Sequence, residues 1–362
     1  MTKIRVNENV TKAPPQPQPP ANKVNPTFKI NLAFNESPYP PSPKALEAYN
    51  ETGKILNRYP NYSSSDLRLV LGKKYGLDDT RIMCTAGSEQ ILSFIARAFI
   101  SDGDEVIYPR YGFMVYRFNI AMAGGIAVPI EHDDYVINVD NILNAVTDKT
   151  RVVFLDNPGN PTGTYVPYDE IKRLCENLPD HILLVLDAAY AEFATEDDYD
   201  AGLDLVDKHQ NVIVTRTLSK LYGLSGLRIG WAYSTEEIIH NLQYLKGGFN
   251  VSKPAQTAGC AAVLDQEYAD EMRNKCRAGI DYLTQELRAM GLNVTSSVCN
   301  FVMLHFPDGR DQMKAADAYL KENDICVGPL GAYGLDSTLR VTVGTDEENN
   351  IFIATMKSFM EK

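Results

Sequence analysis

The sequence lacks the marks of a membrane, metal-binding or nucleic-acid-binding protein. Its six cysteines are scattered without a Cys-x-x-Cys pair, so their spacing predicts neither a zinc site nor a disulfide framework. No apolar run approaches the roughly 20 residues that a transmembrane helix needs. Lys and Arg together number 35 against 47 Asp and Glu, a formal charge of −12. Because a nucleic-acid binder needs a basic face, we expect no nucleic-acid partner. Because no apolar run is long enough to cross a bilayer, we also expect no membrane partner.

The N-terminus also lacks the apolar segment of a secretory signal peptide, so we expect a cytoplasmic protein with reduced thiols. The rest of the composition is ordinary for a globular protein, with 44% hydrophobic and 23% charged residues among 362. A chain of this length has room for one large core and a smaller one.

Proline marks the first boundary along the chain. Residues 13–26 contain six prolines, which favour extended backbone over helix. We expect residues 1–28 to form an N-terminal arm, either a linker or a cover over the active site. We assign residues 29–55 to a small domain, 56–252 to a large cofactor-binding domain and 253–362 to the rest of the small C-terminal domain.

Apolar runs alternate with amphipathic stretches through the middle of the chain. The predicted strands are 81–85, 105–108, 127–129, 151–155, 183–187, 212–215 and 228–232. The predicted helices are 65–75, 89–98, 139–145, 168–177 and 236–245, followed by two longer ones at 254–266 and 268–290. Strands near 300–305 and 339–343 complete a smaller α+β unit. This order predicts an α/β fold, with a mostly parallel sheet flanked by helices and a smaller C-terminal α+β domain.

One lysine lies in a turn rich in glycine and hydroxyl groups. Lys220 follows a predicted strand, with Thr217 and Ser219 before it and Arg228 eight residues later. Hydroxyls and a guanidinium supply the donors and the charge that bind a phosphate. A nearby cation also lowers the pKa of a lysine, as a Schiff-base amine requires. An isolated lysine is usually only a surface residue, so this motif depends on those that accompany it.

Two polar motifs follow predicted strands. Asp187 ends an apolar strand at the sheet edge where α/β proteins bind ligands, and Tyr190 comes three residues later. A carboxylate there can hold a pyridinium proton, although many strands end in Asp. Asn160 is followed by Pro161 in a turn after the strand 151–155. These residues either only form the turn, or they hold the Asn160 amide in position to donate to a ring oxygen.

A third motif opens a predicted helix. Gly87 and Ser88 precede the helix 89–98 directly after a strand. Small residues at a helix N-terminus expose backbone N–H groups that suit a phosphate, although an ordinary N-cap at Ser88 explains the pattern equally well. The turn lacks the Walker pattern, so nucleoside triphosphate binding is not expected.

In this order, the motifs together resemble the fold-type I pyridoxal-phosphate enzymes, in particular the class I and II aminotransferases and their histidinol-phosphate aminotransferase branch. Further matching segments are Asn-Glu-Ser-Pro-Tyr at 35–39, Arg-Tyr-Pro at 58–60, Tyr-Pro-Arg-Tyr at 108–111 and Leu-Arg-Val-Thr-Val-Gly-Thr at 339–345. The resemblance covers residues 30–362.

The resemblance implies pyridoxal 5'-phosphate as cofactor and a role for each matching residue. Lys220 would form the Schiff base and move the substrate proton, Asp187 would keep the ring nitrogen protonated, and Arg340 would bind the substrate carboxylate. Implied cofactor contacts are Tyr190 and Asn160 at the ring oxygen, Tyr111 on the ring face, and Gly87, Ser88, Thr217, Ser219 and Arg228 at the phosphate. Tyr59 would reach that phosphate from the second subunit of a homodimer with shared active sites.

Two departures from the branch shape our substrate hypothesis. Gly328 occupies the position of an arginine that histidinol-phosphate enzymes usually carry, so we expect that histidinol phosphate is not the substrate. Residues 8–11, Glu-Asn-Val-Thr, resemble the N-terminal segment of pyridoxal-phosphate arginine oxidases, although a plain leader is the simpler explanation. An acidic chain also suits a cationic small-molecule substrate. The expected substrate contacts, besides Arg340, are Asn35, Glu36, Asp156, Glu8 and Thr11.

The sequence therefore predicts an enzyme acting on a free amino acid, with two reactions left open. The more specific hypothesis is cyclodehydration of a γ-hydroxyarginine-type substrate to the cyclic amino acid enduracididine, as in the hydroxyarginine cyclodehydratases. The alternative is transamination of a neutral, aromatic or basic amino acid with a 2-oxo acid, because the same residues serve both routes. A cofactor-binding regulator is disfavoured because the arm is too short for a winged-helix domain and Lys220 is present.

Overall fold

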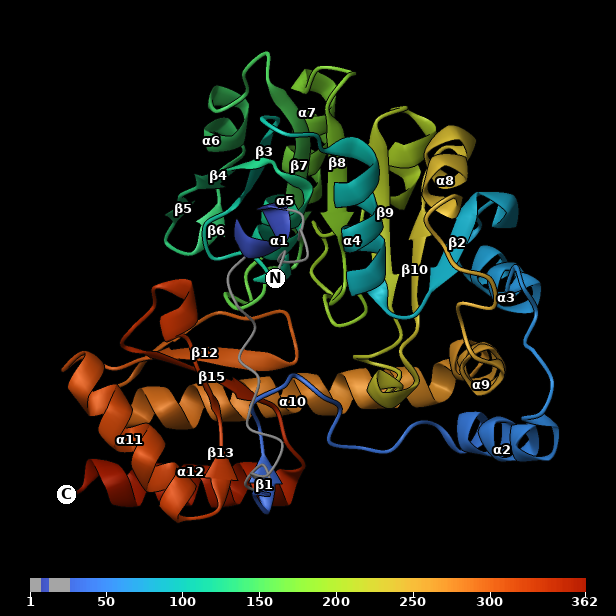
Figure 1. The fold of residues 1–362 in the computed structure, drawn as a ribbon. Helices are drawn as coiled ribbons and strands as arrows, with labels where there is room; N and C mark the ends of the chain where they lie inside the picture. Colours follow the sequence, from blue (N-terminus) through green and yellow to red (C-terminus); the bar gives the residue numbers. More distant parts are fainter. Residues whose placement is uncertain (1–7, 13–26) are drawn as a thin grey trace, which may run out of the picture.

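The computed structural model describes residues 8–12 and 27–362, except for the side chains of residues 11 and 12 (Figure 1). Its largest element is a seven-stranded sheet in the order β2-β10-β9-β8-β7-β3-β4. The strands are β2 (Ile82–Thr85), β3 (Glu105–Pro109), β4 (Ile126–Ile130), β7 (Thr150–Asp156), β8 (Leu183–Asp187), β9 (Val212–Thr217) and β10 (Gly230–Tyr233). Strand β10 runs antiparallel to both of its neighbours, β2 and β9, and every other pair in this sheet is parallel. The predicted α/β fold with a mostly parallel sheet is therefore confirmed.

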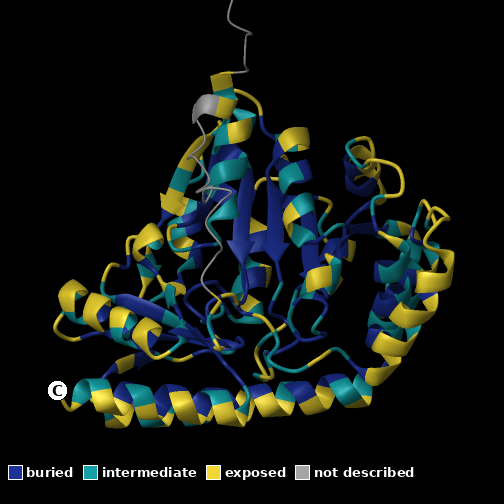
Figure 2. Ribbon diagram, turned by 60° about the horizontal axis from the view of Figure 1, so that its bottom comes forward, coloured by how far each residue is buried: buried dark blue, intermediate teal, exposed yellow. Residues whose placement is uncertain are grey.

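Helices bury both faces of this sheet, which explains why its central strands are almost wholly apolar. Along β7, Val152 and Phe154 pack on one face while Val153 and Leu155 pack on the other. Figure 2 shows the central strands as buried and the outer faces of the helices as exposed. One face is covered by α4 (Ser88–Phe99), α5 (Val115–Ala123) and α8 (Glu236–Gln243), and the other by α3 (Ser65–Tyr75), α6 (Val139–Asn144), α7 (Tyr168–Asn177) and α9 (Lys253–Leu264).

A smaller sheet forms the centre of the C-terminal domain. Its order is β11-β12-β15-β14, made of β11 (Asn293–Thr295), β12 (Phe301–His305), β15 (Thr338–Thr342) and β14 (Gly328–Pro329). The helices of this part are α10 (Gln266–Ala289), α11 (Arg310–Glu322) and α12 (Asp346–Met360). At the start of α12, Thr345 and Glu348 form a reciprocal capping box, which satisfies two backbone N–H groups.

The N-terminal part of the chain contacts both domains. Strand β1 (Ile30–Asn31) pairs with β13 (Ile325–Cys326) in the small domain, and α2 (Pro43–Glu51) packs against α9. Helix α1 (Glu8–Lys12) instead packs against α5 of the large domain, where Asn9 Nδ2 donates to Asp102 Oδ1 at 2.9 Å. Most of the predicted arm, residues 1–7 and 13–26, lies outside the described residues, so its role as an active-site cover stays a prediction.

The remaining elements are short. A two-stranded sheet joins β5 (His132–Asp133) to β6 (Val136–Ile137), and 3-10 helices lie at Thr52–Ile55, Asp79–Arg81, Leu203–Asp207, Ser225–Leu227 and Gly331–Tyr333. One predicted strand begins two residues late: Arg228 has φ 53° and lies in the turn before β10. Among the described helices, none is long and apolar enough to cross a membrane.

Candidate active site

A cavity of about 320 Å³ lies at the carboxyl ends of β7, β8 and β9, and β15 of the small domain contributes to its wall. Parallel strands that end together bring residues distant in sequence to one edge. Most of the residues predicted for the site line this cavity: Asn35, Ser88, Asp156, Asn160, Asp187, Tyr190, Thr217, Ser219, Lys220, Arg228 and Arg340.

Lys220 extends into the cavity from the turn after β9. Its Nζ donates to the carbonyl oxygen of Asn35 at 3.1 Å and lies 5.6 Å from the centre of the Tyr190 ring. Burial and, to a smaller extent, the charge of Arg340 lower the pKa of this amine to about 8, while the charge of Glu36 opposes the shift. At pH 7 about a tenth of a lysine with this pKa is a neutral amine, far more than of an ordinary lysine, so Lys220 is suited to nucleophilic attack and to proton transfer.

Asp187 ends β8 and is 4% exposed. Its Oδ1 accepts a hydrogen bond from Thr215 Oγ1 at 2.9 Å, and its Oδ2 accepts one from the Tyr116 hydroxyl at 3.0 Å. Burial raises the pKa of this carboxyl, while these two donors oppose the shift. Asp187 is therefore a buried carboxyl in a fixed orientation, which suits it to pair with a ring N–H.

Three hydrogen bonds connect residues at the polar wall of the cavity. Arg340, on β15, donates through Nη1 to Asn160 Oδ1 and through Nη2 to the carbonyl oxygen of Ala33, the latter at 2.8 Å. Asn35 Nδ2 donates to the Tyr190 hydroxyl at 2.8 Å. Burial raises the pKa of Tyr190, so this hydroxyl stays protonated and can donate in turn.

The opposite end of the cavity suits a phosphate. Helix α4 begins at Ser88 after Gly87, and no side-chain hydrogen bond caps it. A Cβ at Gly87 would lie 2.5 Å from Arg228 Nη2, and one at Gly230 would lie 2.1 Å from the Ser88 nitrogen. Arg228 Nη1 also lies 3.4 Å from Ser219 Oγ. Only glycines allow these groups to come so close, which leaves backbone N–H, hydroxyl and guanidinium donors for an anion.

Tyr111 is not among the residues that line the cavity, and the expectation that its ring covers the cofactor stays a prediction. The turn closed by Gly112 N and the Pro109 carbonyl at 2.7 Å directs the two aromatic neighbours to different places. The Tyr111 ring stacks on His132 at 4.9 Å, whereas Phe113 lines the cavity. Sequence reasoning missed Phe113, although it lies only two residues from the predicted position. Tyr333 also lines the cavity and was not predicted.

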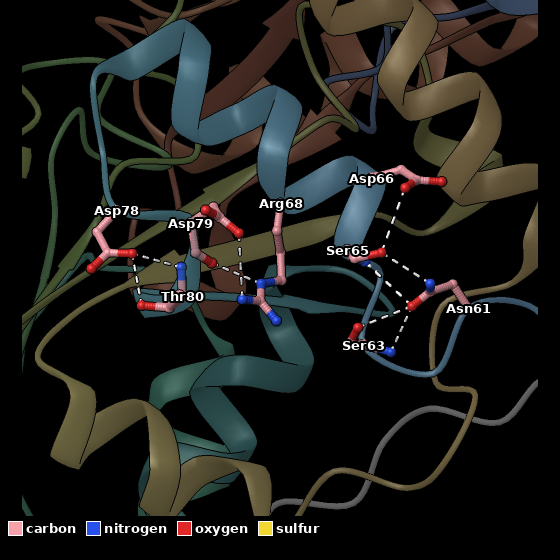
Figure 3. A network of polar contacts seen from close by, with 8 residues as sticks. All are labelled: Asn61, Ser63, Ser65, Asp66, Arg68, Asp78, Asp79 and Thr80. Atoms are coloured by element: carbon pink, nitrogen blue, oxygen red, sulfur yellow. Dashed lines mark hydrogen bonds and ion pairs between the residues drawn. The ribbon is translucent and has the colours of Figure 1, made fainter.

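Tyr59 lies outside the cavity of this chain. It is 79% exposed, and its ring stacks on Phe249 at 4.3 Å, with Tyr62 packed edge-on against the same ring. Figure 3 shows how the loop between them is fixed: Asn61 Oδ1 accepts from Ser63 N at 2.9 Å, and Asn61 Nδ2 donates to Ser65 Oγ at 2.9 Å. An exposed aromatic cluster on a rigid loop is typical of a surface that another chain covers.

The remaining predicted residues do not line the cavity either. Gly87 lies behind Ser88 and contributes space, as described above. Glu36 is exposed and acts on Lys220 through its charge, and Glu8 lies on α1 beside α5. The side chain of Thr11 lies outside the description. The acidic substrate contacts predicted at Glu8 and Glu36 are therefore not part of the cavity wall.

Taken together, these groups define the class of the protein. A half-buried lysine after β9, a buried aspartate at the end of the neighbouring β8, and an anion site at a helix start form a pyridoxal-phosphate site on a fold-type I scaffold. Residues 27–356 match the family described as aminotransferase class I and II, and the chain belongs to this family. The predictions that it is an enzyme and that its cofactor is pyridoxal 5'-phosphate are confirmed.

Individual relatives are similar over almost the whole chain. A histidinol-phosphate aminotransferase of Rhodopseudomonas palustris (strain BisB5) is 43% identical over 347 residues, 96% of this chain and 94% of that protein. One from Paramagnetospirillum magneticum is 43% identical over 332 residues, 91% of this chain and 92% of that protein. The crystal structure of histidinol-phosphate aminotransferase from Sinorhizobium meliloti with pyridoxal-5'-phosphate superposes with a TM-score of 0.87 at 26% identity, covering 92% of this chain and 91% of that one.

These relatives correct our substrate hypothesis. The expectation that histidinol phosphate is not the substrate is wrong, because the relatives at 43% identity over nearly the full chain are histidinol-phosphate aminotransferases. That expectation gave too much weight to one missing side chain at Gly328, whereas Arg340 still lines the cavity. The relatives give no support to the likeness to hydroxyarginine cyclodehydratases, which rested on the missing arginine at Gly328 and on the arginine-oxidase-like segment 8–11.

Proposed function

We propose that this chain is a homodimeric histidinol-phosphate aminotransferase, which moves the amino group of histidinol phosphate to a 2-oxo acid. The observation that carries the proposal is the common cavity of Lys220 and Arg340, which places an amine of lowered pKa and a fixed guanidinium around one space. Its overall similarity to enzymes of that name supports the choice of substrate.

The residues of the cavity fit the cofactor. Asp187 would face the ring nitrogen, Phe113 would lie on the ring face, and Tyr190 with Asn160 would lie near the ring oxygen. The donors at Ser88, Thr217, Ser219 and Arg228 would bind the phosphate. When bound, the cofactor supplies an aldehyde that takes up amino groups and a ring that accepts electrons from the carbon losing its proton.

Lys220 has two tasks in this reaction. Its neutral amine holds the cofactor covalently between turnovers, and after release it removes the proton from the carbon that bears the substrate amine. Its lowered pKa suits both tasks, because a protonated amine can neither attack a carbonyl nor accept a proton. The carbonyl oxygens of Asn35 and Phe34 orient the Nζ atom toward the cavity.

Arg340 would bind the anionic end of each substrate. Its Nε is buried without a partner among the described residues, so this N–H lacks an acceptor within the described part of the chain. The phosphate of histidinol phosphate and the carboxylate of the 2-oxo acid would occupy this position in alternate half-reactions. Across both, the substrate carbon loses an amino group and becomes a ketone, and the 2-oxo acid becomes an amino acid, so no external oxidant is needed.

The aromatic cluster of Tyr59, Tyr62 and Phe249 supports the homodimer. A monomer would expose these rings to water, and the hydrogen bonds of Asn61 hold their loop in place without a partner. In the dimer, the hydroxyl of Tyr59 would reach the cofactor phosphate of the neighbouring subunit.

The proposed function is tested by incubating the purified enzyme with histidinol phosphate and 2-oxoglutarate and measuring glutamate. We expect glutamate to form with histidinol phosphate and to fall by at least about 100-fold with histidinol, which lacks the phosphate. Lys220→Ala serves as the inactive control. Binding of the cofactor with no glutamate from histidinol phosphate would contradict the proposed substrate.

A further inference from the structure

Asp156 is a second buried carboxyl beside Asp187. The two residues end neighbouring parallel strands and are paired in register, and each is 4% exposed. Asp187 has a hydroxyl donor on each oxygen, as described above. Asp156 is held differently, because one of its oxygens has two partners and the other has none among the described residues.

The occupied oxygen connects two segments of the cavity wall. Asp156 Oδ2 accepts from the backbone N–H of Asn160 at 2.9 Å and from that of Phe113 at 3.2 Å. Phe113 belongs to the loop after β3, and Asn160 belongs to the loop after β7. Since Asn160 also accepts from Arg340 Nη1, Asp156 is connected through one residue to the guanidinium on β15.

The other oxygen is closed off from the cavity. Asp156 Oδ1 is buried, and a Cβ at Gly112 would lie 3.0 Å from it and 2.9 Å from the carbonyl oxygen of Pro109. Gly112 therefore lets the loop pass directly over the carboxyl group. A substrate cation cannot reach Oδ1 without moving this loop, so Oδ1 is not available as a substrate contact.

No described cation forms an ion pair with either carboxyl group. The titratable groups that face Asp156 are Asp187 from β8, Tyr116 from α5, Tyr333 from the segment before β15, and Cys299 from the segment before β12. Two adjacent buried carboxylates without a counter-ion are unfavourable, so one of the pair retains its proton. Burial, together with the Asp187 charge, raises the pKa of Asp156 to about 7, and the N–H of Asn160 opposes the shift.

We propose that Asp156 is a positioning residue that acts as a neutral carboxyl, holding Phe113 and Asn160 together beside Asp187, whose two oxygens are held by hydroxyl donors. This inference rests on the proposed function only for the role of Arg340. A neutral Asp156 leaves Asp187 as the single negative charge facing the ring nitrogen of the cofactor. Asp156 thereby fixes the wall over the ring and, through Asn160, the guanidinium that binds the substrate anion.

The test compares Asp156→Asn with Asp156→Ala in the full-length protein. Asparagine keeps the shape, accepts the two N–H groups through its amide oxygen and is neutral, whereas alanine leaves both N–H groups unpaired. We expect the dissociation constant for pyridoxal 5'-phosphate, titrated by its visible absorbance, to stay within about threefold of wild type for D156N and to rise about tenfold or more for D156A. With histidinol phosphate, KM should rise for D156A and be restored in D156N.

A second measurement is independent of substrate and cofactor. Because the folded-state pKa of Asp156 lies above its unfolded value of 3.8, the folded chain holds a proton that the unfolded chain loses, and wild-type stability falls as the pH rises toward about 7. D156N lacks this loss. The difference in Tm between D156N and wild type should therefore be larger at pH 8 than at pH 5, by about 2 °C or more in favour of D156N. Asp180→Asn, at an exposed position, is the matched control and should show no such gain.

Three outcomes would overturn the inference. If D156N were as impaired as D156A, the negative charge of Asp156 would be needed. If D156A bound the cofactor with normal affinity, Asp156 would not position Phe113 and Asn160. If the Tm of D156N and of wild type changed in parallel with pH, Asp156 would hold no proton in the folded protein. If histidinol phosphate proves not to be a substrate, the cofactor titration and the Tm curves still decide the role of Asp156.

Discussion

Arg340 donates a hydrogen bond to Asn160 although 180 residues separate them in sequence. Arg340 lies on β15 in the small domain, and Asn160 lies in the loop after β7 in the large one. The bond fixes the position of the small domain against the edge of the large sheet at the cavity. It also orients the guanidinium before a substrate arrives, which reduces the entropy lost on binding.

Arg340→Lys should weaken substrate binding and leave cofactor binding intact. Lysine keeps the charge but cannot form the two parallel hydrogen bonds of a guanidinium. We expect kcat/KM for histidinol phosphate to fall by about 30- to 150-fold, corresponding to about 2–3 kcal/mol. The dissociation constant for pyridoxal 5'-phosphate should change less than about threefold. An unchanged kcat/KM for Arg340→Lys would contradict the prediction that Arg340 binds the substrate.

Gly328→Arg should improve binding of a phosphorylated substrate. A Cβ at Gly328 would lie 3.4 Å from the carbonyl oxygen of Ala33 and 3.7 Å from Arg340 Nη2, so a side chain begins there without a clash. A second guanidinium beside Arg340 should lower KM for histidinol phosphate by about tenfold. Histidinol, which has no phosphate, should gain nothing, and an equal gain for both would contradict a phosphate contact.

Both the fold and the cofactor site could be predicted largely from the sequence, because each depends on short local patterns. Apolar runs ending in Asp156 and Asp187 marked strands β7 and β8, and the turn around Lys220 marked the cofactor site. Arg228 was placed in a strand because its turn depends on a left-handed backbone, which apolar periodicity does not reveal. The choice between Tyr111 and Phe113 depends on a single turn at Gly112. The bond between Asn160 and Arg340 joins two domains, and no local pattern predicts such a contact.

The reaction of Lys220 with the cofactor should follow a pKa near 8. Below this pH the amine is protonated and unreactive, so the rate of cofactor uptake by the cofactor-free protein should rise with pH and level off above about pH 9. The folded-state pKa lies below the usual 10.5, so the unfolded chain binds a proton that the folded chain lacks between pH 8 and 10.5. Stability should therefore rise across that interval in wild type but not in Lys220→Met. A midpoint of uptake near 10 would contradict the effect of burial.

Removing the exposed aromatic stack should dissociate the proposed homodimer. Tyr59 and Phe249 stack at 4.3 Å on the surface, so the double substitution by alanine deletes the centre of the proposed interface. We expect analytical ultracentrifugation to show mainly monomer at micromolar concentration. Tyr59→Phe keeps the stack and lacks only the hydroxyl, so it should stay dimeric while its dissociation constant for the cofactor rises about tenfold. A dimeric double variant would place the interface elsewhere.

The buried pair of Arg216 and Glu192 should dominate the stability of the strand that leads to Lys220. Their atoms lie 2.9 Å apart with side chains 5% and 4% exposed, and the guanidinium packs over the rings of Tyr75 and Trp231. Glu192→Gln removes the charge that balances a buried cation, so we expect a loss of about 3–5 kcal/mol in the free energy of unfolding, measured by urea denaturation.

The double variant Arg216→Met with Glu192→Gln should recover part of that loss, because no buried charge then remains uncompensated. Lys54→Met is the matched control: Lys54 and Glu51 also pair at 2.7 Å, but their side chains are 74% and 67% exposed, and we expect no measurable change. If Glu192→Gln unfolded at the same urea concentration as this control, burial would not be what gives the Arg216 pair its strength.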